Sequence, residues 1–150
     1  MSNWSCVDDT VMGGVSQSQY QLDKKKGLLW KGEVSLDNNG GFASIRHTLS
    51  SLDLESYIGI SLLVVGDGRT YKLNLGNDNS SRSPRFQARF ATSKHLQMVY
   101  VPFTSLSAYI RGSKVNAEFD TTDIDMIGFL IADKQEGFFQ LSVKRISAYV

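Results

Sequence analysis

The stretch IGISLLVVGDGRTYKLNL, residues 58–75, decides the fold class of this chain. Apolar side chains recur at every second position on both sides of Gly66-Asp67-Gly68, at Ile58, Ile60, Leu62 and Val64 and then at Tyr71, Leu73 and Leu75. A period of two is typical of a half-buried β-strand. Glycines in a short connection accept the positive φ angles of a tight turn. The sequence therefore predicts two strands that pair as a hairpin.

The same alternation recurs along the rest of the chain, and no segment carries a sustained 3.6-residue apolar stripe. We predict about nine strands, over residues 16–22, 28–36, 42–49, 58–64, 71–75, 86–90, 96–101, 126–132 and 139–148. Leu96, Met98 and Tyr100 are taken as the apolar face of their strand, which Pro102 ends or marks as an edge. A phase shift at Lys144-Arg145 indicates a β-bulge, and Lys24-Lys25-Lys26 before Gly27 indicates an exposed hairpin tip.

Many short antiparallel strands bury their apolar faces by packing one sheet on another. The expected architecture is therefore an all-β, jelly-roll β-sandwich. The predicted core consists of Trp30, Val34, Leu62, Val64, Leu73, Phe129, Ile131 and Leu141.

Length and charge bound the function. At 150 residues the chain is expected to form one domain, residues 1–150. Sixteen basic and fifteen acidic side chains leave a charge of +1, which does not favour nucleic acid as a partner. No apolar run reaches the roughly 18 residues of a membrane span, and the single Cys6 cannot form an internal disulfide. We expect a cytoplasmic protein, or an organellar matrix protein if a targeting peptide has been removed.

Two glycine pairs lie in polar loops that lead into strands, in DDTVMGGVS (residues 8–16) and in LDNNGGFASIR (residues 36–46). Such pairs fit where the backbone turns with positive φ or approaches another group closely. We interpret these loops as a binding rim, with a third segment at residues 133–137. The candidate binding residues are Asp9, Thr10, Gly13, Gly14, Asn38, Asn39, Arg46, Arg69, Tyr71, Arg111, Asp133, Lys134 and Glu136.

Arg46 is the most prominent of these candidates. On a regular strand it lies opposite Ala43 and Ile45, so it points outward if that pair faces the core. Its guanidinium suits a carboxylate or phosphate partner. The alternative is a structural ion pair with Asp9, Asp133 or Glu136. For Arg69 we favour a solvated position beside a core Tyr71.

Catalytic and metal chemistry have little support in the sequence. Cys6, His47 and His95 lack the signature of a cysteine nucleophile and the ligand spacing of a zinc site. Asp8-Asp9 with Asn38-Asn39, or residues 120–125, offer oxygen ligands for calcium, but such clusters are also ordinary turn formers. We expect no cofactor, no metal and no intrinsic catalytic activity.

The glycine-rich segments, together with GDGRTYKL (residues 66–73) and IGFLIADKQEG (residues 127–137), resemble the complex I intermediate-associated protein 30 family. The resemblance runs from Trp4 to Tyr149 and includes Arg111-Gly112. Asp8 and Leu96 depart from it, where the family usually has asparagine and tryptophan. The resemblance implies a galactose-binding-domain-like jelly roll and a chaperone role in assembling respiratory complex I.

Two functions therefore compete at the level of sequence. The first is a protein-binding assembly factor, whose partners include subunits of respiratory complexes. The second is a carbohydrate-binding or other small-ligand module, with Trp4, Trp30 or Tyr71 as the stacking surface.

Overall fold

A computed structural model describes residues 4–37, 40–77 and 83–150 of the chain. These residues form short 3-10 turns at η1 (Asp9–Met12) and η3 (Phe103–Ser105) and twelve strands. The strands are β1 (Trp4–Cys6), β2 (Gln17–Asp23), β3 (Gly27–Val34), β4 (Ala43–Leu52), β5 (Gly59–Val65), β6 (Thr70–Gly76), β7 (Arg85–Ala91), β8 (Gln97–Pro102), β9 (Ser107–Ile110), β10 (Ser113–Val115), β11 (Ile124–Ile131) and β12 (Gly137–Tyr149).

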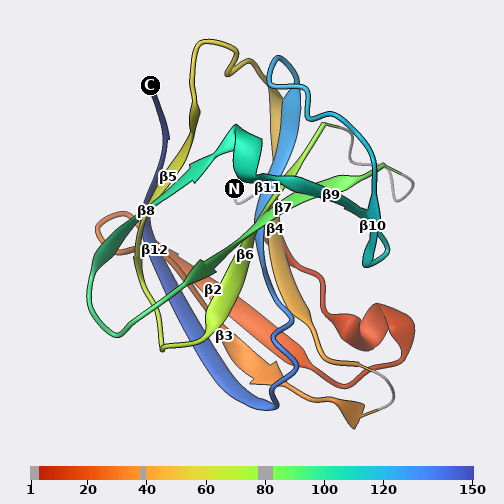
Figure 1. Cartoon of the computed structure of the whole chain (residues 1–150). Coiled ribbons are helices and arrows are strands. Elements are labelled where there is room, and N and C mark those ends of the chain that lie inside the picture. Colours follow the sequence, from red (N-terminus) through yellow and green to blue (C-terminus); the bar gives the residue numbers. More distant parts are fainter. Residues whose placement is uncertain (1–3, 38–39, 78–82) are drawn as a thin grey trace.

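The strands form two antiparallel sheets packed as a sandwich (Figure 1). One sheet has seven strands in the order β1-β4-β11-β6-β7-β9-β10, and the other has five in the order β2-β3-β12-β5-β8. The predicted all-β jelly-roll sandwich is confirmed. The sequence did not reveal β1, β9 and β10, because strands of three or four residues are too short to show a period of two. None of the helices in the described segments is long and apolar enough to cross a membrane.

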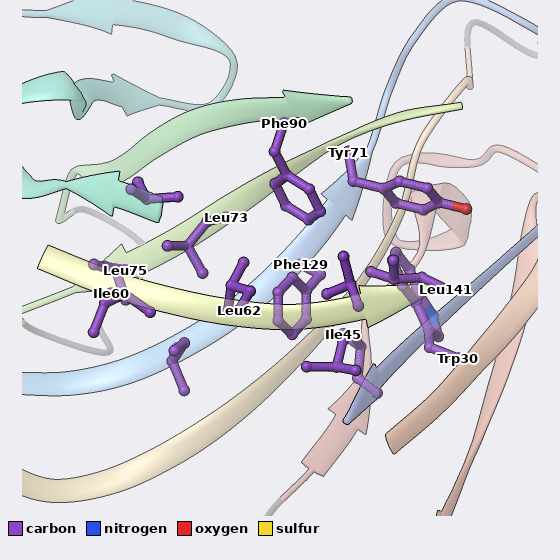
Figure 2. Close-up of a cluster of buried hydrophobic side chains, with 14 of the residues drawn as sticks. Trp30, Ile45, Ile60, Leu62, Tyr71, Leu73, Leu75, Phe90, Phe129 and Leu141 are labelled. Carbon is purple, nitrogen blue, oxygen red and sulfur yellow. The ribbon is translucent and has the colours of Figure 1, made fainter. Parts of the chain in front are cut away.

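The core lies between the two sheets (Figure 2). Every residue predicted for it is at most 1% exposed, including Trp30 of β3 and Phe129 of β11. The rings of Trp30 and Phe139 meet edge to face at 4.7 Å, and those of Phe90 and Phe129 at 6.3 Å. Aromatic pairs in this geometry add attraction beyond the area they bury.

The predicted hairpin over residues 58–75 is wrong. β5 pairs with β12 and β8 in the five-stranded sheet, whereas β6 pairs with β11 and β7 in the seven-stranded sheet. The segment Gly66-Asp67-Gly68 therefore crosses from one sheet to the other. Both strands direct alternate side chains into the shared core, so a crossing and a hairpin give the same pattern in sequence. Gly68 still needs its positive φ of +91°.

The predicted inward face of β8 is also wrong. Leu96, Met98 and Tyr100 are 59%, 43% and 61% exposed, and Val101 is the buried residue. Both faces of β8 carry apolar residues, so the sequence does not show which face is turned toward the core. Ile58 is likewise exposed, because β5 begins only at Gly59.

Three local predictions are confirmed. The register of β12 against β5 shifts between Val143 and Arg145, as expected of a bulge. Lys24 to Lys26 form the exposed turn between β2 and β3, and Gly27 follows with φ of +81°. β8 ends at Pro102 and is an edge strand of its sheet.

Candidate functional site

Asp9 organises the N-terminal loop, at the lower right of Figure 1, where η1 lies beside the β3–β4 connection. Its side chain is fully buried. Its Oδ1 accepts a hydrogen bond from Ser16 N at 2.8 Å, and its Oδ2 accepts from Ser16 Oγ at 2.5 Å, Gly41 N at 2.7 Å and Phe42 N at 3.2 Å. Burial alone would raise the pKa of Asp9, but these donors together lower it. Asp9 thus ties the entry of β2 to the entry of β4 and has no surface with which to touch an external ligand.

Glycine is required in both pairs because the backbone passes close to the Asp9 carboxylate. A Cβ on Gly14 would lie 2.5 Å from Asp9 Cγ, and a Cβ on Gly40 would lie 2.5 Å from Asp9 Oδ2. Their neighbours Gly13 and Gly41 have φ of +87° and +133°. Each pair therefore combines one position of close approach with one of positive φ.

Arg69 forms a second anchor, in which every guanidinium donor is used. Its Nε and Nη2 bind Asp133 Oδ2 and Oδ1 at 3.0 and 2.6 Å. It also donates to the carbonyl oxygens of Gln135 at 2.6 Å, Gly137 at 3.2 Å and Phe138 at 3.1 Å. The side chains of Arg69 and Asp133 are each 11% exposed. The expected solvated position of Arg69 is therefore wrong: it holds the β11–β12 connection in place.

Asp67 completes this anchor from the same crossing segment. Its Oδ2 accepts from Tyr71 Oη at 3.0 Å and from Gln140 N at 2.8 Å, and its Oδ1 accepts from Arg69 N at 3.0 Å. Burial and the Asp67 carboxylate raise the pKa of Tyr71, so its hydroxyl stays a neutral donor. Arg69 and Asp67 together fix the first residues of β12.

The outer face of the five-stranded sheet is hollowed beside this anchored segment. The hollow has a volume of about 790 Å³. We call it the Phe138 groove, and its outward side chains are Gln17, Gln19, Lys31, Glu33, Phe138 and Gln140. Phe138 is 81% exposed, so an exposed aromatic ring lines the same hollow as three glutamine side chains.

The same outer face becomes apolar toward its free edge. Leu96, Met98 and Tyr100, in and just before β8, form what we call the β8 stripe. The ring of Tyr100 meets that of Tyr149 at 5.2 Å, which extends the stripe onto β12. Ile58, which is 57% exposed, lies beside the far end of β8, where its carbonyl accepts from Phe103 N at 2.9 Å.

Three of the candidate segments meet at one end of the sandwich, whereas Arg111 lies elsewhere. The N-terminal loop and the β3–β4 connection meet at Asp9, and Glu136 Oε1 accepts from Leu36 N at 3.0 Å, which brings the third segment to the same end. Thr10 and Lys134 are exposed. Arg111 lies in the β9–β10 turn, at the opposite edge of the seven-stranded sheet from β4. Asn38 and Asn39 lie outside the described residues.

Arg46 does point outward, opposite Ser5 and Gly128 on the seven-stranded sheet. The alternative of an ion pair with Asp9, Asp133 or Glu136 is wrong. Asp133 is paired with Arg69, and Asp9 and Glu136 accept from backbone or serine donors.

The prediction that Trp4, Trp30 or Tyr71 stacks on a sugar is also wrong. Trp30 and Tyr71 are completely buried. Trp4 is half-buried and packs on His47 and Phe129. The exposed ring is Phe138, which sequence reasoning missed although its phase was available: Phe139, Leu141 and Val143 face the core, so Phe138 must face outward. The alternating glutamines of QSQYQ (residues 17–21) were a second missed signal.

The catalytic alternative gains nothing from the geometry. Burial, with the nearby Asp8 carboxylate, raises the pKa of the Cys6 thiol, whereas a nucleophilic cysteine needs a lowered one. His95 lies exposed in the β7–β8 connection, whereas Cys6 lies in β1 and pairs with Ile45 of β4. No group of three metal-ligating side chains occurs among residues 4–37, 40–77 and 83–150.

The fold is a jelly-roll sandwich of two antiparallel sheets. Residues 1–143 match the complex I intermediate-associated protein 30 family, and the chain belongs to that family. Its structure is similar to a family 11 carbohydrate-binding module from Clostridium thermocellum, solved with a β-1,3-1,4-mixed-linked tetrasaccharide, at a TM-score of 0.73 and 16% identity over 98% of this chain and 88% of that one. A family 30 carbohydrate-binding module of a cellulosomal cellulase of Clostridium thermocellum gives a TM-score of 0.64 at 13% identity, over 97% and 91% of the two chains. At these identities the likeness establishes the fold alone.

Proposed function

We propose that this chain is a non-catalytic binding domain that holds a protein partner against the β8 stripe. The observation that carries the proposal is an edge strand whose outward side chains are Leu96, Met98 and Tyr100. Natural proteins usually protect sheet edges with charge, proline or a covering segment, because an apolar edge pairs with other chains. Of these devices the described part of the edge has Pro102 at one end and Lys94 beyond the other, with none on the stripe itself.

Two features of the stripe suit a protein rather than a small ligand. β8 pairs on one side with β5, so its other side is free to pair with a strand of a partner. The apolar side chains continue onto Tyr149 and Ile58, which gives an extended surface in place of a closed pocket. The description of the family indicates the partner: an intermediate in the assembly of respiratory complex I.

A photocrosslinker placed along the stripe tests this proposal. Benzoylphenylalanine replaces Met98 in the chain expressed in its own organism, and the matched control carries it at Lys25, on the exposed β2–β3 turn. We expect one discrete adduct from position 98 and none from position 25. Adding Tyr100→Lys to the position-98 variant should remove that adduct. Equal adducts from both positions, or an adduct indifferent to Tyr100→Lys, would contradict the proposal.

A second function is favoured by one specific observation, the Phe138 groove. An exposed ring beside amide side chains matches the general chemistry of sugar recognition, in which aromatic faces stack on the ring and polar groups bind its hydroxyls. As the alternative function, we propose that the Phe138 groove binds a carbohydrate.

The carbohydrate alternative is tested with a glycan array and the pair Phe138→Ala and Tyr100→Lys. Phe138→Ala should abolish any glycan binding, whereas Tyr100→Lys should leave it intact. Loss in Tyr100→Lys alone, or no binding by the parent protein, would argue against the groove as a sugar site.

A further inference from the structure

Five of the sixteen basic side chains of this nearly neutral chain lie on the outer face of the seven-stranded sheet. Ala43, Ile45, Leu73 and Phe129 face the core, so the positions between them face outward. Following the cross-strand pairs from β1 to β10, the outward basic residues are Arg46, Lys72, Arg85, Arg89 and Lys114. None of the described outward positions in these pairs is Asp or Glu. The described cross-strand pairs of this face therefore carry basic and no acidic side chains, and Asp125 falls at the register shift of β11, outside those pairs.

Two of these cations lie directly opposite one another. Lys72 of β6 and Arg89 of β7 are cross-strand partners on the same face. Like charges in this arrangement repel and destabilise a sheet. Burial and the adjacent Arg89 lower the pKa of Lys72. Its ammonium lies 5.8 Å from the centre of the Tyr109 ring, and no described carboxylate pairs with either cation.

The same two residues line a pocket of about 380 Å³. The β11–β12 connection forms its wall, so that the full lining is Thr70, Lys72, Arg89, Ala132, Asp133, Lys134 and Gln135. Lys134 adds a third cation. Its φ of +61° places a non-glycine residue in the left-handed region, a conformation that costs free energy and is enriched at ligand sites.

The one carboxylate in the pocket is already neutralised. Both oxygens of Asp133 are taken by Arg69, at 2.6 and 3.0 Å. Asp133 is therefore held away from the role of counter-ion for Lys72 and Arg89. Lys72, Arg89 and Lys134 thus line a cavity whose own acid is committed to Arg69, and none of the three forms an ion pair with a described carboxylate.

We propose that this pocket binds a phosphate group, either as free phosphate or as the monoester of a small molecule. A dianion between Lys72 and Arg89 converts their repulsion into two charge-assisted contacts. The planar guanidinium of Arg89 suits two oxygens of one phosphate, and the ammonium groups of Lys72 and Lys134 suit single oxygens. Thr70 supplies a neutral hydroxyl at the wall. This site is distinct from the β8 stripe and the Phe138 groove, and does not depend on the function proposed for either.

Side-chain NMR of the intact chain, titrated with inorganic phosphate at constant ionic strength, tests the proposal. The Lys72 Nζ and Arg89 Nε signals should shift along one saturable curve, and those of Lys25 should not. Lys72→Met, which keeps the aliphatic stem, and Arg89→Gln should each weaken binding at least about tenfold, since each removes a hydrogen bond to a charged group. The matched control Lys25→Met should bind as the parent does. Equal, unsaturated drift of all lysine signals would show nonspecific association of phosphate with surface cations and would overturn the proposal.

Thermal unfolding gives a second, independent readout, the change in Tm that phosphate causes in each variant. Phosphate at ten times its Kd should raise the Tm of the parent and of Lys25→Met by about 4 °C. Lys72→Met should show no such gain, and its Tm without phosphate should not fall below that of the parent, because a repulsion has been removed. An equal gain in Lys72→Met would contradict the proposal. Glycerol phosphate distinguishes the source: tighter binding than inorganic phosphate indicates a monoester ligand, and equal or weaker binding indicates free phosphate.

Discussion

The two outer faces of this sandwich differ in chemistry although they belong to one small structure. The five-stranded sheet presents glutamine amides, an exposed ring at Phe138 and the apolar β8 stripe. The seven-stranded sheet presents arginine and lysine and, at the outward positions of its described cross-strand pairs, no acid. The outer face of the five-stranded sheet carries both Lys31 and Glu33, whereas the described cross-strand pairs of the other face carry basic side chains without acidic ones. Net charge describes neither face, and the two are suited to different partners.

The anchor at Arg69 lies between these faces. On one side it holds the carbonyl of Phe138 at the groove, and on the other it withholds Asp133 from Lys72 and Arg89. The difference between the faces therefore depends in part on a single ion pair.

The largest expected effect separates the core from both faces. Phe129→Ala should cost roughly 3 to 5 kcal/mol of unfolding free energy, because it removes a fully buried ring. Phe138→Ala, the same substitution at an exposed ring, should change stability by less than about 0.5 kcal/mol. Urea unfolding of both variants provides the comparison. Similar losses in the two would mean that Phe138 packs against the fold and does not stand free.

The next effect would break the anchor between the faces. Arg69→Met should cost about 3 kcal/mol, since it leaves Asp133 largely buried without its counter-ion. The double variant Arg69→Met with Asp133→Asn should recover part of the loss. In the single variant Asp133 becomes available to Lys72 and Arg89, so phosphate binding should weaken as well. Unchanged phosphate binding would show that the anchor does not protect the cationic pocket.

A smaller effect concerns the carboxylate that ties β2 to β4. Asp9→Asn should cost about 2 kcal/mol at neutral pH, because an amide cannot replace an anion that accepts four hydrogen bonds. Folding lowers the pKa of Asp9 below its ordinary value of 3.8. The stability it contributes is therefore fully present above that value and is lost as pH falls through the folded pKa.

Unfolding measured from pH 7 to pH 2 checks this sign. The difference between the parent and Asp9→Asn should narrow below about pH 4. A difference that stays constant into acid would mean that the native state does not need the Asp9 anion.

The smallest expected effect is the change in stability when an acidic side chain is added to one or the other outer face. Asn74→Asp places a carboxylate on the cationic face, two residues from Lys72 on the same strand face, and should stabilise the protein by about 0.5 kcal/mol at low salt. Ser142→Asp on the other face, whose cross-strand partners are Leu29 and Val65, should bring no such gain. Added salt should erase the gain in Asn74→Asp. A destabilised Asn74→Asp would contradict the description of Lys72 and Arg89 as neighbouring cations that lack a described acidic partner.

The sequence predicts the sandwich well because alternation reports which residues share a face. It predicts Trp30, Leu73 and Phe129 as core for that reason. It does not report which strands pair, so β5 and β6 were joined as a hairpin although they belong to different sheets. Where both faces of a strand carry apolar residues, as in β8, the phase is undetermined and the exposed stripe was placed inside.

The site was harder to predict than the fold. Conspicuous motifs, the glycine pairs around Asp9 and the segment around Arg69, turned out to position other residues. The surfaces they support are made of unremarkable residues such as Gln17, Phe138 and Met98. The sequence motifs identify residues that hold the fold together, such as Asp9 and Arg69. The composition of a surface can be described only once the strand register shows which residues of different strands are neighbours.

Partner retention compared between the two faces is the most direct test of the central claim, that the β8 stripe is the protein-binding surface. The tagged chain is purified from its own organism as the parent, as Met98→Lys with Tyr100→Lys, and as Lys72→Met, after urea unfolding has shown all three to be folded. The account predicts a stoichiometric partner that is retained by the parent and by Lys72→Met and is lost at least about tenfold from the stripe variant, as expected when an apolar contact is replaced by charge. Full retention by the stripe variant, with loss from Lys72→Met, would contradict it and would assign protein binding to the cationic face.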